Sequence, residues 1–330
     1  MKLRKFYFYF ILAIFIPTAF GATAAGYEQI SIYRFDKELC RLQNGDSAAV
    51  SRIESDMFPV VDGFIKPLMP DSAQSISAKL NTFANLKNIN FFYTDVENAF
   101  PDLNGIEHTL DTIQGNMIKL FKMGLPKLYS IISPYNQPII ILNDTAFAIA
   151  LNHYLGTAYK PYSYYPPYKR TYKVPRRIPY DVAEATIKTR HPYIPKDSTL
   201  IERILYEGMA VYALKSVFPS VTPEMLFSAT DEQLKWAKDN ASMIFNKLNE
   251  VAKSTDRKQI AMYFSDSPFS PQISPLCMGC IGRWIGFHLI EEFLRHCDIK
   301  IPELLETKSY QNSNLFIDKT TKLWQIGHLD

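Results

Sequence analysis

The chain has little of what most catalytic motifs are built from. Its 330 residues include only 13 glycines, six histidines and four cysteines. No Gly-x-Ser-x-Gly elbow, phosphate-binding glycine loop or dinucleotide-binding glycine pattern occurs, which argues against α/β-hydrolases, P-loop enzymes and Rossmann enzymes. The pattern His-Glu-x-x-His is also absent from the chain. The standard helical zinc site of metallopeptidases is therefore excluded.

The chain also lacks a large excess of positive or negative charge. Lysine and arginine number 36 against 33 acidic residues, and Lys2, Arg4 and Lys5 account for the difference. The remainder of the chain is neutral, so we expect no nucleic acid partner. After residue 25 no run of 18 apolar residues occurs, and we expect that part of the chain to be soluble.

Residues 1–24 are predicted to be a signal peptide. A basic end precedes the apolar stretch Phe6–Ile16, and Ala22-Thr-Ala24 is a plausible cleavage site. The alternative is an uncleaved N-terminal anchor, and membrane attachment is expected only in that case. No cysteine follows the cleavage site before Cys40, which argues against a lipid anchor. The pattern predicts secretion across the inner membrane to the periplasm or cell envelope.

The four cysteines are disulfide candidates in an oxidising compartment, where three complete pairings are possible. They are Cys40, Cys277, Cys280 and Cys297. The pair Cys277-Met-Gly-Cys280 precedes a predicted helix, but no strand signal precedes it, as a thioredoxin-like site requires. A structural disulfide or unreactive thiols are therefore favoured over redox catalysis.

The periodicity of apolar residues predicts a mainly α fold with a small β-sheet, of the α+β class. Residues 25–135 are predicted to form a helical region, and residues 136–330 an α+β region that packs with it as one compact unit. Pro138–Leu142 is the strongest strand signal, and Lys127–Ile132 is its possible partner. A helix is expected where Ile106, Leu110, Ile113, Met117 and Leu120 recur at a spacing of three to four. Further helices are expected at roughly 145–155, 179–190, 198–217, 222–228, 231–250, 281–297 and 302–307. Thr222 is expected to cap the helix at 222–228, and Ser198 or Asp197 to begin the helix at 198–217.

One segment differs in composition from the rest. Tyr159–Tyr180 holds seven tyrosines, five prolines and six Lys/Arg residues, with no acidic residue. Its proline density predicts an extended loop packed over the body of the protein. The loop is either a cover for the core or a stacking platform for a glycan or a protein. The platform residues would be Tyr162, Tyr164, Tyr165 and Tyr168.

Two glycine-containing helices are candidates for a binding cleft. Gly282 and Gly286 lie four residues apart in one predicted helix, and Glu207 directly precedes Gly208 in another. Glycines leave a smooth strip that a ligand or another backbone can approach closely. The predicted cleft comprises Glu207, Gly208, Gly282, Trp284, Gly286 and His288. The alternative is close helix packing, with Trp284 as a buried anchor and Glu207 paired with Arg203.

A metal site has weak support. His288, Glu292 and His296 are spaced four apart and align along one helical face. The apolar residues of that helix lie on the opposite face, so we expect the three polar residues to lie along the solvated border of an amphipathic helix. We therefore expect no metal and no cofactor.

The chain resembles the GldB gliding-motility lipoproteins of the bacterial cell envelope over nearly all of the region after the signal peptide. The pieces that carry the resemblance are Arg34–Lys37, Ala150–Gly156, the tyrosine-rich loop and the Gly-x-Trp-x-Gly-aromatic element in Gly282–Leu289. That family is typically lipid-anchored. This chain lacks the anchoring cysteine, so membrane attachment does not carry over.

The family is in turn similar to zincin-type metallopeptidases, which implies a zincin-like architecture. Glu207-Gly-Met-Ala210 fits the second zincin element, and Glu184 lies where the general base of the first would be. Ala183 and Ile187 replace both histidine ligands, and neither can bind zinc. The resemblance therefore implies a non-catalytic protein that binds another envelope protein or a cell-wall component. The alternatives are an atypical metallopeptidase and a glycan-binding protein.

Overall fold

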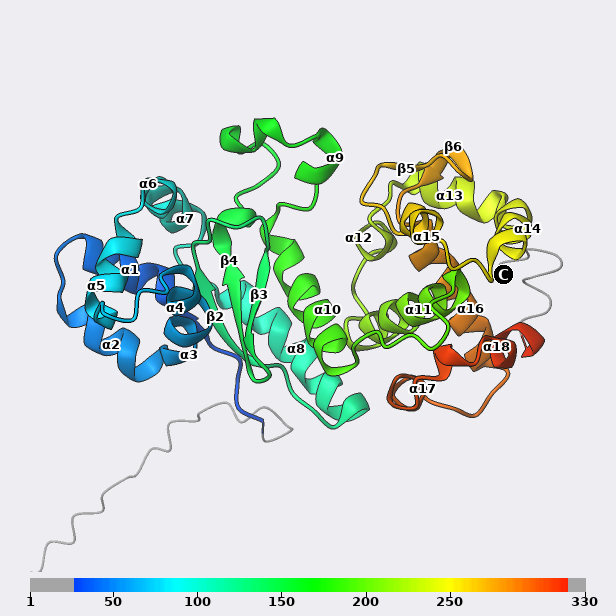
Figure 1. The fold of residues 1–330 in the computed structure, drawn as a ribbon, viewed down its shortest axis with the longest axis horizontal. Helices are drawn as coiled ribbons and strands as arrows, with labels where there is room; N and C mark the ends of the chain where they lie inside the picture. The colour runs from blue at the N-terminus through cyan, green and yellow to red at the C-terminus, as the bar shows by residue number, and fades with distance from the viewer. Residues whose placement is uncertain (1–26, 320–330) are drawn as a thin grey trace, which may run out of the picture.

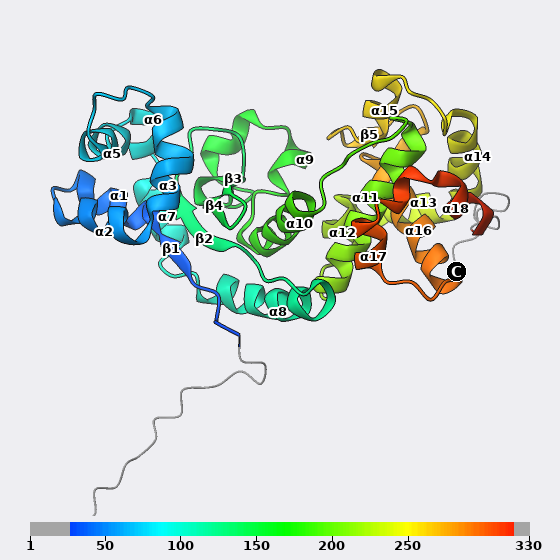
Figure 2. The same cartoon turned by 60° about the horizontal axis from the view of Figure 1, so that its bottom comes forward.

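The computed structural model describes residues 27–319, and the predicted signal peptide lies outside this range. The described chain forms two lobes, one built on a sheet and one built of helices (Figure 1). It is mainly helical with a small mixed sheet, which confirms the predicted α+β class. Both views place α10 between the sheet and the helical lobe (Figures 1 and 2).

The sheet has the strand order β1-β2-β4-β3, in which β1, β2 and β4 are parallel and β3 is antiparallel to β4. The strands are β1 (Ile32–Arg34), β2 (Lys127–Ile131), β3 (Ile139–Asn143) and β4 (Ala146–Ala150). Both predicted strands are confirmed, but they do not pair with each other because β4 lies between them. β2 lies before the predicted boundary at residue 135 and β4 lies after it, so the sheet joins the two predicted regions.

The helix expected at 145–155 is wrong. Residues Ala146–Ala150 form the strand β4, and all five are buried. Alanine favours helices, but a short, continuous apolar run is also typical of a strand covered on both faces. A single 3-10 turn, Leu151–His153, follows the strand.

The helices of the sheet lobe come from the N-terminal part of the chain. They are α1 (Phe35–Gln43), α2 (Ala48–Asp56), α3 (Phe58–Val60), α4 (Lys66–Leu68), α5 (Ile76–Ala84), α6 (Lys87–Asn90), α7 (Tyr93–Ala99) and α8 (Asn104–Phe121). In α8 the predicted apolar spacing is confirmed, because Leu110, Ile113 and Met117 are buried.

The helical lobe follows α10 (Ile178–Arg190), and its core is the pair α11 (Leu200–Val217) and α16 (Ile281–Arg295). Around them lie α12 (Pro223–Phe227), α13 (Asp231–Asp239), α14 (Ala241–Val251), α15 (Arg257–Tyr263), α17 (Ile301–Glu306), α18 (Ser313–Lys319) and the hairpin of β5 (Phe269–Ser270) and β6 (Ser274–Met278).

Helix boundaries follow local capping. Thr222 caps α12 as predicted, since its hydroxyl accepts the backbone N–H of Met225. The cap of α11 is Thr199 rather than Ser198 or Asp197, because Thr199 forms a capping box with Glu202. The helix predicted at 231–250 is two helices that break at Asn240.

The tyrosine-rich segment connects the two lobes. It is not a fully extended loop, because its prolines begin three short helical turns: Lys160–Tyr164, α9 (Pro167–Arg170) and Pro175–Arg177. The Tyr159 hydroxyl donates to Asp95 of the sheet lobe. The Tyr168 and Tyr172 hydroxyls donate to the Asp266 and Ser228 carbonyls of the helical lobe, both at 3.0 Å.

Candidate functional site

The two glutamates that the sequence predicted as catalytic candidates lie close together. Glu184 is on α10 and Glu207 on α11, and the ammonium group of Lys188 lies between them. The Lys188 Nζ is 2.8 Å from Glu207 Oε2 and 3.1 Å from Glu184 Oε1. The packing of α10 against α11 therefore joins the two carboxylates through one cation.

Two arginines complete this cluster of charges. Arg203 contacts Glu207 Oε1 at 2.6 Å, as the spacing of four residues predicts. Arg283, from the first turn of α16, contacts Glu184 Oε1 at 2.8 Å. Neither Lys188 nor Arg283 is aligned for a hydrogen bond with Glu184 Oε1, so their contacts with that oxygen are ion pairs only. Three cations thus surround two carboxylates.

The cations determine the ionisation of both carboxylates. Burial alone would raise the pKa of Glu184, but Arg283 and Lys188 outweigh it and hold the pKa well below its usual range. Burial likewise opposes ionisation of Glu207, whose side chain is 3% exposed, and Lys188 and Arg283 lower its pKa. Carboxylates held in this state are poor proton acceptors near neutral pH.

The two residues that the zincin resemblance puts at the ligand positions, Ala183 and Ile187, have apolar side chains. Ala183 is fully buried and Ile187 is 2% exposed. Within residues 27–319, no three His, Cys, Asp or Glu side chains are grouped to hold a metal. Lys188 was not predicted from the sequence, although its spacing of four residues from Glu184 indicates an ion pair on one helix face. Arg283 was not predicted either, because its contact with Glu184 joins residues about a hundred positions apart in the sequence.

The cluster continues along α10 to the junction between the lobes. Arg283 donates to the Tyr180 hydroxyl at 2.9 Å, and the Arg177 guanidinium lies 3.6 Å from the centre of the Tyr180 ring. Arg177 also pairs with Asp181 at 2.9 Å, and Asp181 accepts the Tyr154 hydroxyl at 2.7 Å. This chain of contacts joins the sheet lobe to α16.

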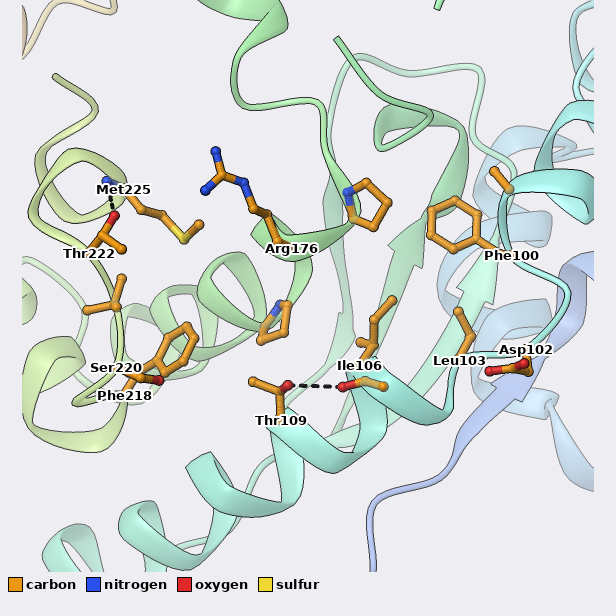
Figure 3. Close-up of a pocket in the computed structure, with 15 residues that line it drawn as sticks. Phe100, Asp102, Leu103, Ile106, Thr109, Arg176, Phe218, Ser220, Thr222 and Met225 are labelled. Atoms are coloured by element: carbon orange, nitrogen blue, oxygen red, sulfur yellow. Dashed lines mark hydrogen bonds between the residues drawn. The ribbon is translucent and has the colours of Figure 1, made fainter. Parts of the chain in front are cut away.

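A groove lies at the lobe junction, above the end of this cluster. It consists of two cavities of about 570 Å³ each, which share Arg176, Thr222 and Met225. Figure 3 shows the Arg176 side chain directed toward α12, with Phe100, Ile106 and Phe218 among the surrounding apolar residues. Arg176 is exposed, and within the described residues it has no hydrogen bond or ion pair.

The predicted cleft residues pack against one another. A Cβ atom on Gly208 would lie 2.2 Å from the Gly286 carbonyl carbon, and one on Gly282 would lie 2.6 Å from the Phe264 ring. Trp284 is 3% exposed. The glycine strip is therefore covered by a helix and a ring, which is the packing alternative that the sequence left open.

The three weak metal candidates, His288 and Glu292 on α16 and His296 directly after it, do not form a metal site within the described part of the chain. His288 contacts Glu291 at 3.2 Å, and its ring centre lies 4.7 Å from that of Trp284. His296 contacts Glu292 at 2.8 Å. The side chains pair along the helix border as the amphipathic pattern predicts.

All four cysteines are free in the structure. The expectation that no strand precedes the Cys-x-x-Cys pair is wrong, since Cys277 lies in β6. That strand belongs to an isolated antiparallel hairpin rather than to a parallel sheet. Burial raises the pKa of Cys277 to about 12, and burial also raises that of Cys280 against the effect of Arg283. Neither thiol is activated.

The four predicted platform tyrosines do not share one surface. Tyr162 is 3% exposed, whereas Tyr164 is 74% exposed. The Tyr165 hydroxyl donates to Asn136 at 2.7 Å, and Tyr168 contacts the helical lobe instead. Tyr164 and Tyr165 remain neighbours, with ring centres 4.2 Å apart.

No helix within residues 27–319 is long and apolar enough to cross a membrane. No curated protein and no solved structure matches the chain. A protein-family model does match, over residues 23–314, and its description is gliding motility protein GldB. The order of Arg34–Lys37, Ala150–Gly156 and Gly282–Leu289 led to the same family. The chain belongs to the GldB gliding-motility family.

Proposed function

We propose that this protein is a non-catalytic component of the periplasm or cell envelope that acts in gliding motility by binding another envelope component. The observation that carries the proposal is the position of Lys188 between Glu184 and Glu207. A lysine side chain occupies the space between the carboxylates that a zincin-like enzyme would need for metal and water. Family membership supports the link to gliding motility.

The proposal includes descent from a zincin-like metallopeptidase. By the sequence resemblance, Glu184 on α10 and Glu207 on α11 correspond to the two zincin elements, and the packing of these helices against each other supports this proposal. A peptidase of that type needs three protein ligands and an open coordination position on its zinc. Ala183 and Ile187 supply no ligand, and the two remaining carboxylates are engaged by cations. An atypical metallopeptidase would use some of His191, Glu207, His288 and Glu292, but His288 contacts Glu291 and Glu292 contacts His296 instead.

The groove at the lobe junction is the surface that best fits a protein partner. Its walls are largely apolar, and among the described residues Arg176 has no hydrogen bond or ion pair there, although its charge helps to lower the pKa of Glu224 in the same groove. Such a surface suits an extended segment with an apolar side chain and a carboxylate. The Arg177 cluster beneath the groove fixes the backbone around Arg176, so the site is preorganised.

Metal analysis tests the absence of catalysis. The chain of residues 25–330, purified without chelator or metal-affinity resin, should be folded and hold no stoichiometric zinc. About one tightly bound zinc per chain, together with chelator-sensitive peptide hydrolysis, would overturn the proposal.

Crosslinking in cells tests the binding role. A photoreactive residue at Ser220, which lines the groove, should give a discrete crosslinked product that Arg176→Glu abolishes. The same residue at Ser163, exposed on the tyrosine-rich segment, is the matched control and should not give that product. A product that persists in Arg176→Glu would exclude the groove.

A further inference from the structure

A second pocket lies in the sheet lobe, and aromatic side chains from three separate segments line it. Tyr164 is 74% exposed and Tyr135 50%, and Phe92 is half-buried. They come from the tyrosine-rich segment, the connection between β2 and β3 and the connection between α6 and α7. Aromatic residues from three separate segments at one pocket, two of them well exposed, indicate a binding surface rather than chance exposure.

The pocket itself is small and uncharged. Its volume is about 180 Å³, and Asn88, Asn136, Ser133 and Tyr135 are among its lining residues. No Lys, Arg, Asp or Glu lines it. Burial lowers the pKa of His153, the titratable imidazole in the lining, to about 4, so this ring is neutral near pH 7. None of the lining side chains therefore offers a charge to an ionic ligand.

The aromatic wall is held rigidly. The Tyr165 ring lies 4.2 Å from that of Tyr164, and its hydroxyl donates to Asn136 Oδ1 at 2.7 Å. The Lys173 ammonium lies 4.2 Å from the centre of the Tyr165 ring and donates to His153 Nδ1 at 3.1 Å. The Lys173 ammonium is thus held by the Tyr165 ring and His153. Rigid aromatic surfaces lose little entropy on binding.

The lining also holds polar groups that a ligand can use. The Asn136 carbonyl oxygen is used by Tyr165, which leaves its NH₂ group for a ligand. Asn88 is exposed and has no hydrogen-bond partner within the described residues. The lining thus combines exposed aromatic rings with neutral amide groups.

This combination matches a neutral sugar ring. A pyranose presents an apolar C–H face that stacks on an aromatic ring and a rim of hydroxyl or acetamido groups that bond to amides. We propose that the pocket formed by Tyr164, Tyr135 and Asn88 binds a neutral, N-acetylated hexose unit of a cell-wall glycan strand. This pocket shares no lining residue with the groove at the lobe junction.

A soluble glycan tests this proposal directly. The chain of residues 25–330 should bind a β-1,4-linked N-acetylglucosamine tetramer saturably, as measured by saturation-transfer NMR and titration. Tyr164→Ala should weaken binding about tenfold, because the stacking ring is lost. Asn88→Ala should weaken it as well. Both side chains are exposed, so neither change should alter the fold, which circular dichroism checks.

Matched controls keep the result specific. Phe58→Ala removes an aromatic side chain of 44% exposure on α3, away from the pocket, and should leave binding unchanged. An α-linked glucose tetramer should bind at least tenfold more weakly. The proposal is overturned if the N-acetylated tetramer does not bind, if Tyr164→Ala binds it equally well, or if both tetramers bind alike. Any of these results leaves the crosslinking test of the groove unaffected.

Discussion

Gly208 on α11 and Gly286 on α16 meet backbone against backbone. A Cβ atom on Gly286 would lie 2.1 Å from the carbonyl oxygen of Ile204, and one on Gly208 would lie 2.2 Å from the carbonyl carbon of Gly286. Both obstacles are backbone atoms, so no side-chain rearrangement can relieve them. The close crossing also brings Arg283 of α16 near Glu207 of α11, and Arg283 contributes to the low pKa of that carboxyl.

Gly208→Ala should therefore force the two helices apart and destabilise the protein. Overpacked cores usually lose 1–3 kcal/mol, and we expect about 3 kcal/mol here because backbone is displaced. Gly115→Ala, in the middle of α8 with open space around it, is the matched control. That change should stabilise the helix by roughly 0.5–1 kcal/mol. Urea unfolding of both variants measures the difference, and a stable Gly208→Ala would mean that the helices are not in contact.

The elements that the sequence predicted well have a strong local signal. The apolar spacing of α8, the strand β3 and the cap at Thr222 each depend on neighbours within a few residues. The strand β4 was missed because Ala146–Ala150 has no local feature that separates a buried strand from a helix. Its identity is decided by pairing with β2 and β3, which the sequence alone does not reveal.

In the candidate site, too, contacts between residues close in sequence were predicted, and contacts between distant residues were not. The pairing of Glu207 with Arg203 follows from helix spacing, and the sequence predicted it. Arg283 joins Glu184 only because α16 crosses α11 at two glycines, which is a tertiary relationship. The tyrosine-rich segment was recognised by composition, but its roles differ residue by residue: Tyr162 is buried and Tyr164 is exposed.

Cys277 should resist alkylation in the native protein. Its side chain is fully buried, and burial raises its pKa to about 12. At pH 8 its thiolate fraction is about a thousandfold below that of an ordinary cysteine. Iodoacetamide labelling followed by mass spectrometry should modify the half-buried Cys297 first, and Cys277 only after unfolding in urea. Equal labelling rates, or a disulfide found at Cys277, would contradict the structure.

Glu207→Gln should destabilise the protein by about 3 kcal/mol, because it leaves Lys188 and Arg203 without their shared carboxylate. Glu54→Gln, at an exposed position on α2, should change stability by less than about 0.5 kcal/mol. Urea unfolding at pH 7 compares the two variants. A Glu207→Gln variant of native stability that had lost a peptidase activity would identify Glu207 as catalytic rather than structural.

The same carboxylate predicts a response to acid. The folded state lowers the pKa of Glu207 and holds that of Glu184 well below its usual range. Their contribution to stability is therefore complete above the ordinary glutamate pKa of about 4.3 and is lost as the pH falls below it. Between pH 4.5 and 3 the unfolding free energy of the wild type should fall more steeply than that of Glu207→Gln. Parallel curves would show that the ion pairs do not contribute.

A second loss of stability, due to His153, is expected at higher pH than the loss due to the glutamates. Its imidazole is 6% exposed, accepts the Lys173 ammonium, and has a pKa of about 4, mainly because of burial. An unfolded histidine titrates near 6.5, so the stability that depends on neutral His153 is complete above pH 6.5 and is lost as the pH falls toward 4. From pH 6.5 to 5, where glutamates remain ionised, the loss should be about 2 kcal/mol.

Urea unfolding of the wild type, His153→Gln and His108→Gln between pH 6.5 and 5 separates the effect of His153 from that of other titrating groups. His153→Gln should show a shallower dependence of the unfolding free energy on pH than the wild type. Some dependence should remain in that variant, because burial also lowers the pKa of His191. His108→Gln, at an exposed position on α8, should keep the wild-type dependence. If His153→Gln and the wild type gave the same slope, the pKa of His153 would be the same in the folded and unfolded protein, and the pocket that it lines would gain a positive charge below about pH 6.5.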